Sequence, residues 1–149
     1  MDQHSKVPSR RTTVTSSLLQ AGSIWKRAAE KALVDDGISV ARANLLLWVG
    51  RMGGGVRQVQ LAECLGLASQ SMVRLLDELS ATGHLERRED PNDRRAKTIW
   101  LTQEGSALAN RVELVLSSLR ADVLGDICDD DIEAAHRVFD AIITRSGLA

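Results

Sequence analysis

The apolar residues of this chain recur with the period of an α-helix along most of its length. The clearest case is the set Met72, Leu75, Leu76 and Leu79, whose i, i+3, i+4 and i+7 spacing predicts one apolar stripe along a helix. Ser69 precedes that stripe and is expected to cap the helix, because its hydroxyl can accept from backbone N–H groups that lack partners in the first turn. The opposite face would then present polar side chains to a solvent or a partner.

A charged segment after this helix predicts a β-hairpin. Residues 85–88 and 98–101 suit two short antiparallel strands, and Pro91, Asn92 and Asp93 between them favour a turn. The loop ends in three cations, which are Arg94, Arg95 and Lys97. A helix followed by a hairpin with cations at its tip fits duplex DNA, because a helix enters the major groove and a cationic hairpin reaches phosphates or the minor groove.

Helical patterns also flank this helix-and-hairpin unit. The polar start of the chain, residues 1–16, is expected to form a flexible arm. Five helices are predicted outside the unit: Ser17 to about Val34, a second capped by Ser39, a short third from Arg57 to Gly66, a long one from Gln103 to about Leu124 capped by Thr102, and a last one starting at Asp130 and Glu133. A length of 149 residues and a hydrophobic content of 44% predict a single, mainly helical globular domain.

Composition and charge exclude several classes of protein. The formal net charge is −1, so the charge total does not indicate a nucleic-acid partner, and the placement of the cations must carry that argument. No apolar run approaches the roughly 20 residues of a membrane span, and the polar start lacks an apolar signal core, so we expect a cytoplasmic protein. The sequence has no Gly-rich phosphate loop, metal-ligand cluster or nucleophile with a nearby base, which predicts no enzyme activity, no metal and no cofactor.

The two cysteines, Cys64 and Cys128, are too few and too far apart for a disulfide framework or a metal site. Cys64 lies in the apolar part of a predicted helix, so a buried thiol is the main interpretation. A redox-responsive regulator that uses a cysteine is the alternative.

Five segments, in order and at matching spacing, resemble the winged helix-turn-helix of the MarR/SlyA family of bacterial regulators. They are QLAECLGL (60–67), SQSMVRLLDEL (69–79), GHLERR (83–88), DRRAK (93–97) and LTQEG (101–105). The resemblance implies a mainly α fold with a small β-wing, in which residues 38–102 form the DNA-binding part. Residues 17–36 and 103–149 would be dimerisation helices, so that residues 17–149 form one domain.

The resemblance also implies a homodimer that binds an inverted-repeat operator in double-stranded DNA. Arg74 is the first candidate for a base contact, because a guanidinium can bond two acceptors of guanine; an ion pair with Glu78 on a solvated face is the alternative. In the family's D-x-R element the Asp braces the wing and the Arg enters the minor groove, roles that the resemblance gives to Asp93 and Arg95. The full set of DNA-contact candidates is Ser69, Gln70, Ser71, Val73, Arg74, Arg87, Arg88, Asp93, Arg94, Arg95 and Lys97.

Members of the family often bind small aromatic or phenolic carboxylates in a crevice between the dimer helices and the DNA-binding part. Trp25, Arg42, Trp48 and Arg51 could supply stacking faces and anion partners there, and placement in the core or on the surface is the alternative for each. The function predicted is a homodimeric, sequence-specific repressor that a small ligand releases from DNA. A winged-helix protein–protein adaptor is the second hypothesis, which equal affinity for random and cognate duplex would favour.

Overall fold

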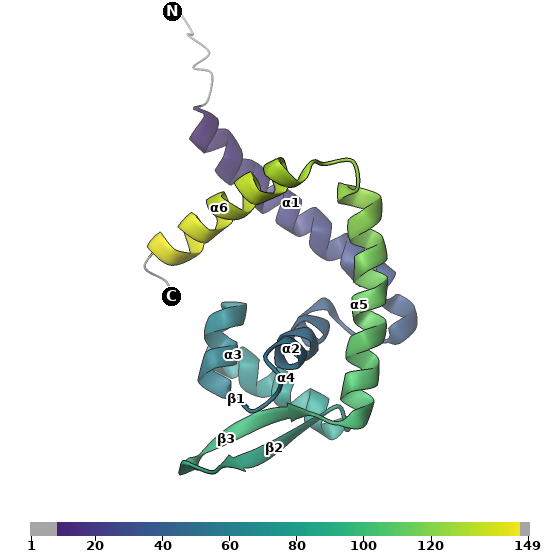
Figure 1. Ribbon diagram of the computed structural model, residues 1–149, viewed down its shortest axis with the longest axis vertical. Coiled ribbons are helices and arrows are strands. Elements are labelled where there is room, and N and C mark those ends of the chain that lie inside the picture. Colours follow the sequence, from purple (N-terminus) through teal and green to yellow (C-terminus); the bar gives the residue numbers. More distant parts are fainter. Residues whose placement is uncertain (1–8, 147–149) are drawn as a thin grey trace, which may run out of the picture.

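The computed structural model describes residues 9–146, which form a mainly helical fold with a small antiparallel sheet (Figure 1). The predicted fold class is therefore confirmed. In chain order the elements are α1 (Arg10–Ala32), the 3-10 helix η1 (Val34–Asp36), α2 (Val40–Arg51), β1 (Val56–Arg57), α3 (Gln58–Leu65), α4 (Ser69–Ala81), β2 (Leu85–Asp90), β3 (Asp93–Leu101), α5 (Gln103–Leu124) and α6 (Asp129–Arg145). None of the helices in this part of the chain is long and apolar enough to cross a membrane.

The hydrophobic core lies where α2, α3, α4 and the first half of α5 meet the sheet. All four residues of the predicted stripe on α4 are buried, which confirms the pattern that singled out this helix. In α2, the three consecutive residues Leu45, Leu46 and Leu47 are all buried. The reason is that α2 packs against α3, α4, α5 and β3, so more than one face of the helix is covered.

The hairpin is longer than predicted, and it is joined by a third strand. β3 pairs antiparallel with β2 on one side and with the two-residue strand β1 on the other. The strand predictions 85–88 and 98–101 miss the charged ends of β2 and β3. Backbone pairing continues there, with Glu89 opposite Lys97, because opposite charges on facing strands stabilise the pair. These charged positions show no alternation of apolar and polar residues, so the sequence pattern does not reveal them as strand.

Two helix caps are confirmed, since the hydroxyls of Ser39 and Thr102 accept from the N–H groups of Arg42 and Gly105. Close packing fixes the start of α5 further: an added Cβ at Gly105 would collide with the carbonyl oxygen of His84. The hydroxyl of Thr102 also donates to the carbonyl of Gly83 over 2.6 Å, so α5 starts directly beside the end of the wing.

Three predicted helix starts are wrong. α1 begins at Arg10 rather than Ser17, because Ser9 caps it by accepting from the N–H of Thr12 over 3.2 Å. The predicted flexible arm at 1–16 is therefore helical over residues 10–16, while residues 1–8 lie outside the described part of the chain. Ser69 is the first residue of α4 and makes no cap bond, and α6 begins at Asp129, one residue before the predicted start. Polar first turns carry little apolar pattern, so periodicity does not locate them.

The last helix lies far from the core. Figure 1 shows α6 crossing α1 at the end of the molecule opposite the wing, and none of its described residues is buried. Five apolar side chains of α6 are exposed: Ile132, Val138, Phe139, Ile142 and Ile143. The described chain therefore leaves the apolar side chains of this helix largely uncovered.

The prediction of a buried Cys64 is wrong. Both cysteines are exposed and free. α3 is short: Leu61 is buried, Ala62 and Leu65 pack against the core, and Cys64 lies outside this covered side. An apolar stretch only eight residues long does not determine which face is covered.

Candidate nucleic-acid interface

The second helix of the helix-turn-helix, α4, presents a polar face away from the core. Ser69, Gln70 and Ser71 are exposed in its first turn, and Val73 is 41% exposed one residue later. The side chain of Arg74 is 75% exposed. Because the buried stripe fixes the rotation of the helix, these residues share one accessible side that is free to approach a partner.

Glu78 lies between two arginines at this face. Its carboxylate is 3.8 Å from Arg74 and also 3.8 Å from Arg42, which belongs to α2. The ion pair foreseen as the alternative role of Arg74 is thus present. Exposed pairs at such distances contribute only about 0–1 kcal/mol, so this contact does not withdraw Arg74 from a DNA phosphate or base.

The cations along the sides of the wing have anionic neighbours. Arg87 on β2 donates to Asp77 of α4 over 2.6 Å, and Lys97 lies 3.3 Å from Glu89. Arg88 pairs with Glu86 on the same strand, and its guanidinium lies 4.6 Å from the centre of the Trp100 ring. The Arg87–Asp77 contact also places the wing beside α4, so helix and wing form one continuous surface.

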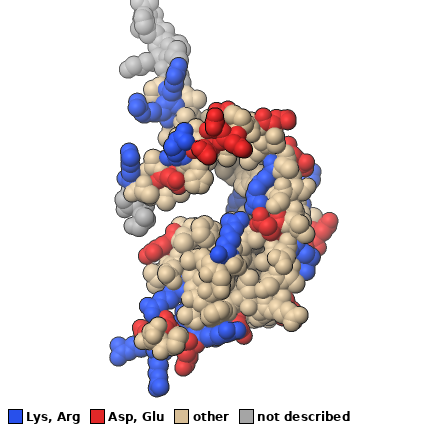
Figure 2. Space-filling model, viewed as in Figure 1, with Lys and Arg blue, Asp and Glu red and all other residues tan. Residues whose placement is uncertain are grey.

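The tip of the wing differs from its sides. Arg94 and Arg95 are exposed, and within residues 9–146 neither forms an ion pair. Asp93 accepts from the backbone N–H of Arg95 over 3.0 Å, which shapes the turn locally. In Figure 2 blue side chains project from the lower end of the molecule, where Figure 1 places the hairpin. The wing therefore carries its uncompensated positive charge at the tip.

A brace between the wing and the helix-turn-helix involves two residues outside the predicted set. Asp90, at the end of β2 and 6% exposed, accepts from Nε and Nη2 of Arg57 over 2.9 and 2.6 Å. Arg57 precedes α3, and its own N–H donates to the side chain of Gln60 over 3.0 Å. Arg57 is a cation directly before a predicted helix, and that is the signal in the sequence that could have pointed to an anionic partner. The start of α3 is thus fixed by contacts other than a hydroxyl cap.

The surroundings of Asp90 favour its ionised form. The backbone N–H of Asn92 donates to Oδ1 over 2.8 Å, and the Arg57 guanidinium donates to Oδ2. These two contacts, in that order of importance, hold the pKa of Asp90 below its ordinary value despite the opposing effect of burial. Asp90 is therefore charged, and the brace is formed, throughout the neutral range.

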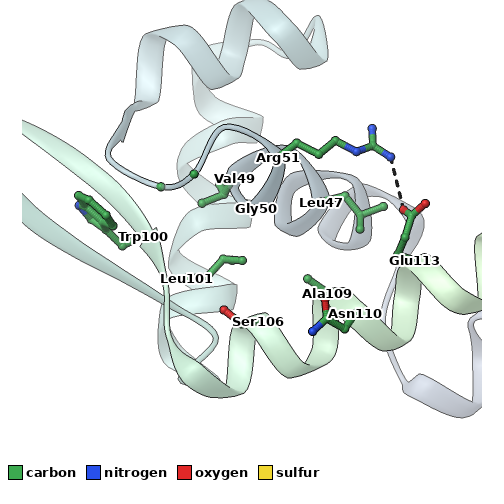
Figure 3. A pocket seen from close by; sticks show the side chains of 12 residues that line it. Leu47, Val49, Gly50, Arg51, Trp100, Leu101, Ser106, Ala109, Asn110 and Glu113 are labelled. Carbon is green, nitrogen blue, oxygen red and sulfur yellow. Dashed lines mark hydrogen bonds and ion pairs between the residues drawn. The ribbon is translucent and has the colours of Figure 1, made fainter.

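A cavity of about 470 Å³ lies next to the wing, between α2, the glycine turn after it, β3 and α5 (Figure 3). Of the four residues predicted to bind a ligand, Arg51 alone lines this cavity. Trp48 packs against the core and Arg42 contacts Glu78, so Trp25, Arg42 and Trp48 do not gather around Arg51 as expected. Helical periodicity placed them on their helices but not relative to one another.

The cavity has apolar walls and an ionic rim. Leu47, Leu101 and Trp100 contribute apolar surface, and Figure 3 shows Arg51 reaching across the rim to Glu113 of α5, 3.4 Å away. Glu113 also accepts from Arg120 over 2.9 Å. Burial opposes ionisation of Glu113, but the hydrogen bond and charge of Arg120 and the charge of Arg51 outweigh it and lower its pKa. Sequence reasoning found neither Trp100 nor Glu113 as lining residues.

A helix-turn-helix whose second helix is exposed, followed by a hairpin with a cationic tip, defines a winged-helix DNA-binding protein. The family model described as MarR family matches residues 36–96. The fold also matches the crystal structure of the transcriptional regulator PA3341, with 30% sequence identity, a TM-score of 0.80, and coverage of 89% of this chain and 97% of that one. The chain belongs to the MarR family, whose members are transcriptional regulators rather than enzymes.

Two further solved structures have informative ligands. CouR from Rhodococcus jostii RHA1, bound to p-coumaroyl-CoA, is 27% identical, with a TM-score of 0.85 over 93% of this chain and 97% of that one. A mutant MarR from E. coli complexed with operator DNA is 21% identical, with a TM-score of 0.73 over 85% of this chain and 91% of that one. The second likeness concerns the fold alone.

Proposed function

We propose that this MarR-family regulator is a homodimeric repressor that binds an inverted-repeat operator and is released by a small aromatic carboxylate. The observation that carries the DNA-binding surface is the continuity of the exposed α4 face with the wing, whose tip holds Arg94 and Arg95 without an anionic partner among residues 9–146. The structural relative bound to operator DNA uses the same fold, which supports this assignment.

The candidates at this surface have different tasks. Arg74 and the polar side chains of the first turn of α4 contact base edges, because that turn is where helix-turn-helix proteins meet the major groove. Arg94 and Arg95 contact phosphates and the minor groove. Arg87, Arg88 and Lys97 share their charge with carboxylates and contribute less. Asp90, through Arg57, and Asp93 hold the wing in position.

Dimerisation would cover the apolar side of α6. Alongside the five exposed apolar residues of that helix, Leu19 and Ile24 of α1 are 78% and 49% exposed. Exposed apolar side chains that gather on neighbouring helices are typical of protein–protein interfaces. A two-fold dimer would place the two α4 helices about one DNA turn apart, roughly 34–36 Å, which accounts for an inverted repeat as the target.

The effector would occupy the cavity beside the wing. Its volume of about 470 Å³ suits a small ligand, its walls suit an aromatic ring, and Arg51 can bind a carboxylate in place of Glu113 because Glu113 keeps Arg120 as a partner. The relative CouR was crystallised with p-coumaroyl-CoA, an aromatic acyl thioester, which supports an aromatic effector.

The test is a gel shift with the protein's own upstream intergenic DNA and, in parallel, selection from a random duplex library, with random duplex as competitor. Arg74→Ala and Arg95→Ala should each lower specific affinity by about 5- to 100-fold. Arg111→Ala is the matched control: it removes an exposed arginine that pairs with Asp36 and lies outside the proposed DNA-contact surface, so this variant should bind DNA normally. Unchanged binding by both test variants would refute the site assignment, and equal affinity for all duplexes would favour an adaptor.

A further inference from the structure

Trp100 connects the cavity to the wing. It belongs to β3, and it lines the cavity together with its neighbour Leu101. Leu101 packs against the core, with its Cδ1 atom 3.4 Å from the position that a Cβ on Gly50 would take. Trp100 instead contacts the glycine turn and the other strand of the wing, so of the two wing residues in the cavity wall it is the one that does not pack against the core.

One side of the Trp100 indole lies against the glycine turn that follows α2. A Cβ on Gly54 would lie only 2.6 Å from Cε3 of the ring, and one on Gly55 only 3.0 Å from Cζ2. Both glycines have positive φ, 79° and 68°. The turn thus accepts the ring because it carries no side chains, and the two meet in close van der Waals contact.

The indole is also tied to the other strand of the wing. Nε1 of Trp100 donates to the hydroxyl of Thr98 over 2.9 Å, and that hydroxyl in turn donates to the carbonyl of Arg88 over 3.3 Å. The Arg88 guanidinium covers the ring at 4.6 Å from its centre. A displacement of the ring would therefore be transmitted to β2 as well as β3.

We infer that Trp100 couples occupancy of the cavity to the orientation of the wing, and this inference rests on the proposed effector site. An aromatic carboxylate held by Arg51 would place its ring among Leu47, Leu101 and Trp100. A ligand changes the population of two wing orientations only if it contacts them unequally. Trp100 makes the ligand's contacts with the two wing orientations unequal, because the position of its side chain in the cavity wall depends on where the wing lies.

The experiment places a known occupant in the cavity. In a Cys64→Ser, Cys128→Ser background, Ser106→Cys puts a thiol on the lining of the cavity, and reaction with Ellman's reagent attaches 5-thio-2-nitrobenzoate, an aromatic carboxylate, through a disulfide. Ser118→Cys on the exposed side of α5, outside the cavity lining, is the matched control. The affinity for the duplex selected above is measured before modification, after modification, and after reduction of the disulfide.

The adduct at residue 106 should lower DNA affinity at least about tenfold, reversibly, and the adduct at residue 118 should not. With Trp100→Leu added, the effect at residue 106 should fall below about threefold, while the unmodified variant still binds DNA. An equal effect with and without Trp100 would overturn the inference and leave the effector site standing. No effect in the presence of Trp100 would overturn both, because the cavity would then not act on DNA binding.

A second measurement keeps the inference testable if Trp100→Leu does not fold. Trp25→Phe with Trp48→Phe leaves Trp100 as the single tryptophan of the chain. Coupling between occupancy of the cavity and DNA binding is reciprocal. If Trp100 carries this coupling, DNA binding must therefore alter the surroundings of Trp100. A shift of several nanometres in its emission on adding the selected duplex is expected, and an unchanged emission would overturn the inference.

Discussion

Individual charges would decide where the proposed contact surface attracts DNA, because most cations on it have an anionic neighbour. Arg87 is paired with Asp77 and Lys97 with Glu89, while Arg94 and Arg95 form no ion pair within the described chain. Release of counterions from DNA requires net positive charge at the phosphates. The contribution of each cation therefore depends on its neighbour, which explains how a chain with a net charge of −1 can bind a polyanion.

Glu78 gives a direct test of this view. Glu78→Gln should raise DNA affinity about two- to fivefold, because it removes the carboxylate that lies 3.8 Å from Arg74 at the proposed contact face. Glu30→Gln removes an equally charged group from an exposed pair with Lys26 on α1 and should change affinity little. Fluorescence anisotropy at fixed ionic strength measures both, and a loss of affinity in Glu78→Gln would mean that Glu78 positions Arg74 rather than competing for it.

The Arg57–Asp90 brace predicts a pH dependence. The pKa of Asp90 is lowered in the folded protein, so its stabilising effect is present above the unfolded value of about 3.9 and is lost as the pH falls through the lowered folded value. Asp90→Asn should therefore melt at a lower temperature than the parent at pH 5–8, and the two melting temperatures should converge below about pH 4.

Thermal unfolding followed by circular dichroism between pH 3 and pH 8 measures this difference, with the exposed Asp122→Asn on α5 as control. In gel shifts at pH 7.5 the same Asp90→Asn variant should bind operator about tenfold more weakly, because a wing without its brace must be ordered on binding. A difference in melting temperature that persists unchanged to pH 3 would show that Asp90 acts through packing rather than charge.

At the scale of elements, the turn between α2 and β1 determines how the wing meets the body. Gly53 and Gly54 have nearly equal φ values of 78° and 79°, but a Cβ at Gly53 would meet open space while one at Gly54 would lie 2.6 Å from Trp100. Alanine at Gly53 would therefore introduce backbone strain alone, whereas alanine at Gly54 would introduce the same strain and also displace the indole of Trp100.

Both Gly53→Ala and Gly54→Ala should be destabilised by the strain of a positive φ, at about 1 kcal/mol. Gly54→Ala should lose about 1–3 kcal/mol more, because the ring must leave the turn. Urea unfolding of the two variants side by side gives the difference. Equal losses would show that Trp100 moves away without cost.

Elements with one strongly amphipathic side were predictable, and elements fixed by tertiary contacts were not. The stripe of α4 identified its buried residues because it spans two full turns. β1 has two residues and exists because β3 offers it an edge at Ile99 and Thr98, which no local pattern contains. The same limit applies to the site: the chemistry of a guanidinium selected Arg74 and the family resemblance selected Arg95, but the Arg57–Asp90 contact and the cavity lining depend on how distant segments meet.

At the scale of the whole molecule, the chain has one well-packed end and one that is incomplete. The core, the wing and α4 lie together, whereas α6 crosses α1 at the opposite end without a buried residue in the described chain (Figure 1). Between these two helices runs an apolar groove that includes Val14, Leu18 and Val138. An amphipathic helix whose apolar side remains exposed to water is not stable, because most helical stability in proteins comes from burying that side.

In the proposed dimer a second copy of the chain covers this end, and charges placed on α6 should prevent that. Val138→Glu with Ile142→Glu puts two carboxylates on side chains that are 40% and 36% exposed and line the groove with α1. Fully burying such a side chain contributes about 1.5–3 kcal/mol, and covering what is still exposed of these two, in both copies, contributes about that much in total, so the double variant should raise the dimer dissociation constant at least about tenfold.

His136→Glu with Thr144→Glu adds the same charge to the other side of α6, and this control should remain dimeric in sedimentation equilibrium. The groove variant should also lose operator affinity, since a monomer holds one half-site at a time and forgoes the high effective concentration of the second α4. A groove variant that remains dimeric would place the interface elsewhere. One that becomes monomeric yet binds operator unchanged would show that a single copy reads the whole site, and the proposed inverted repeat would then be wrong.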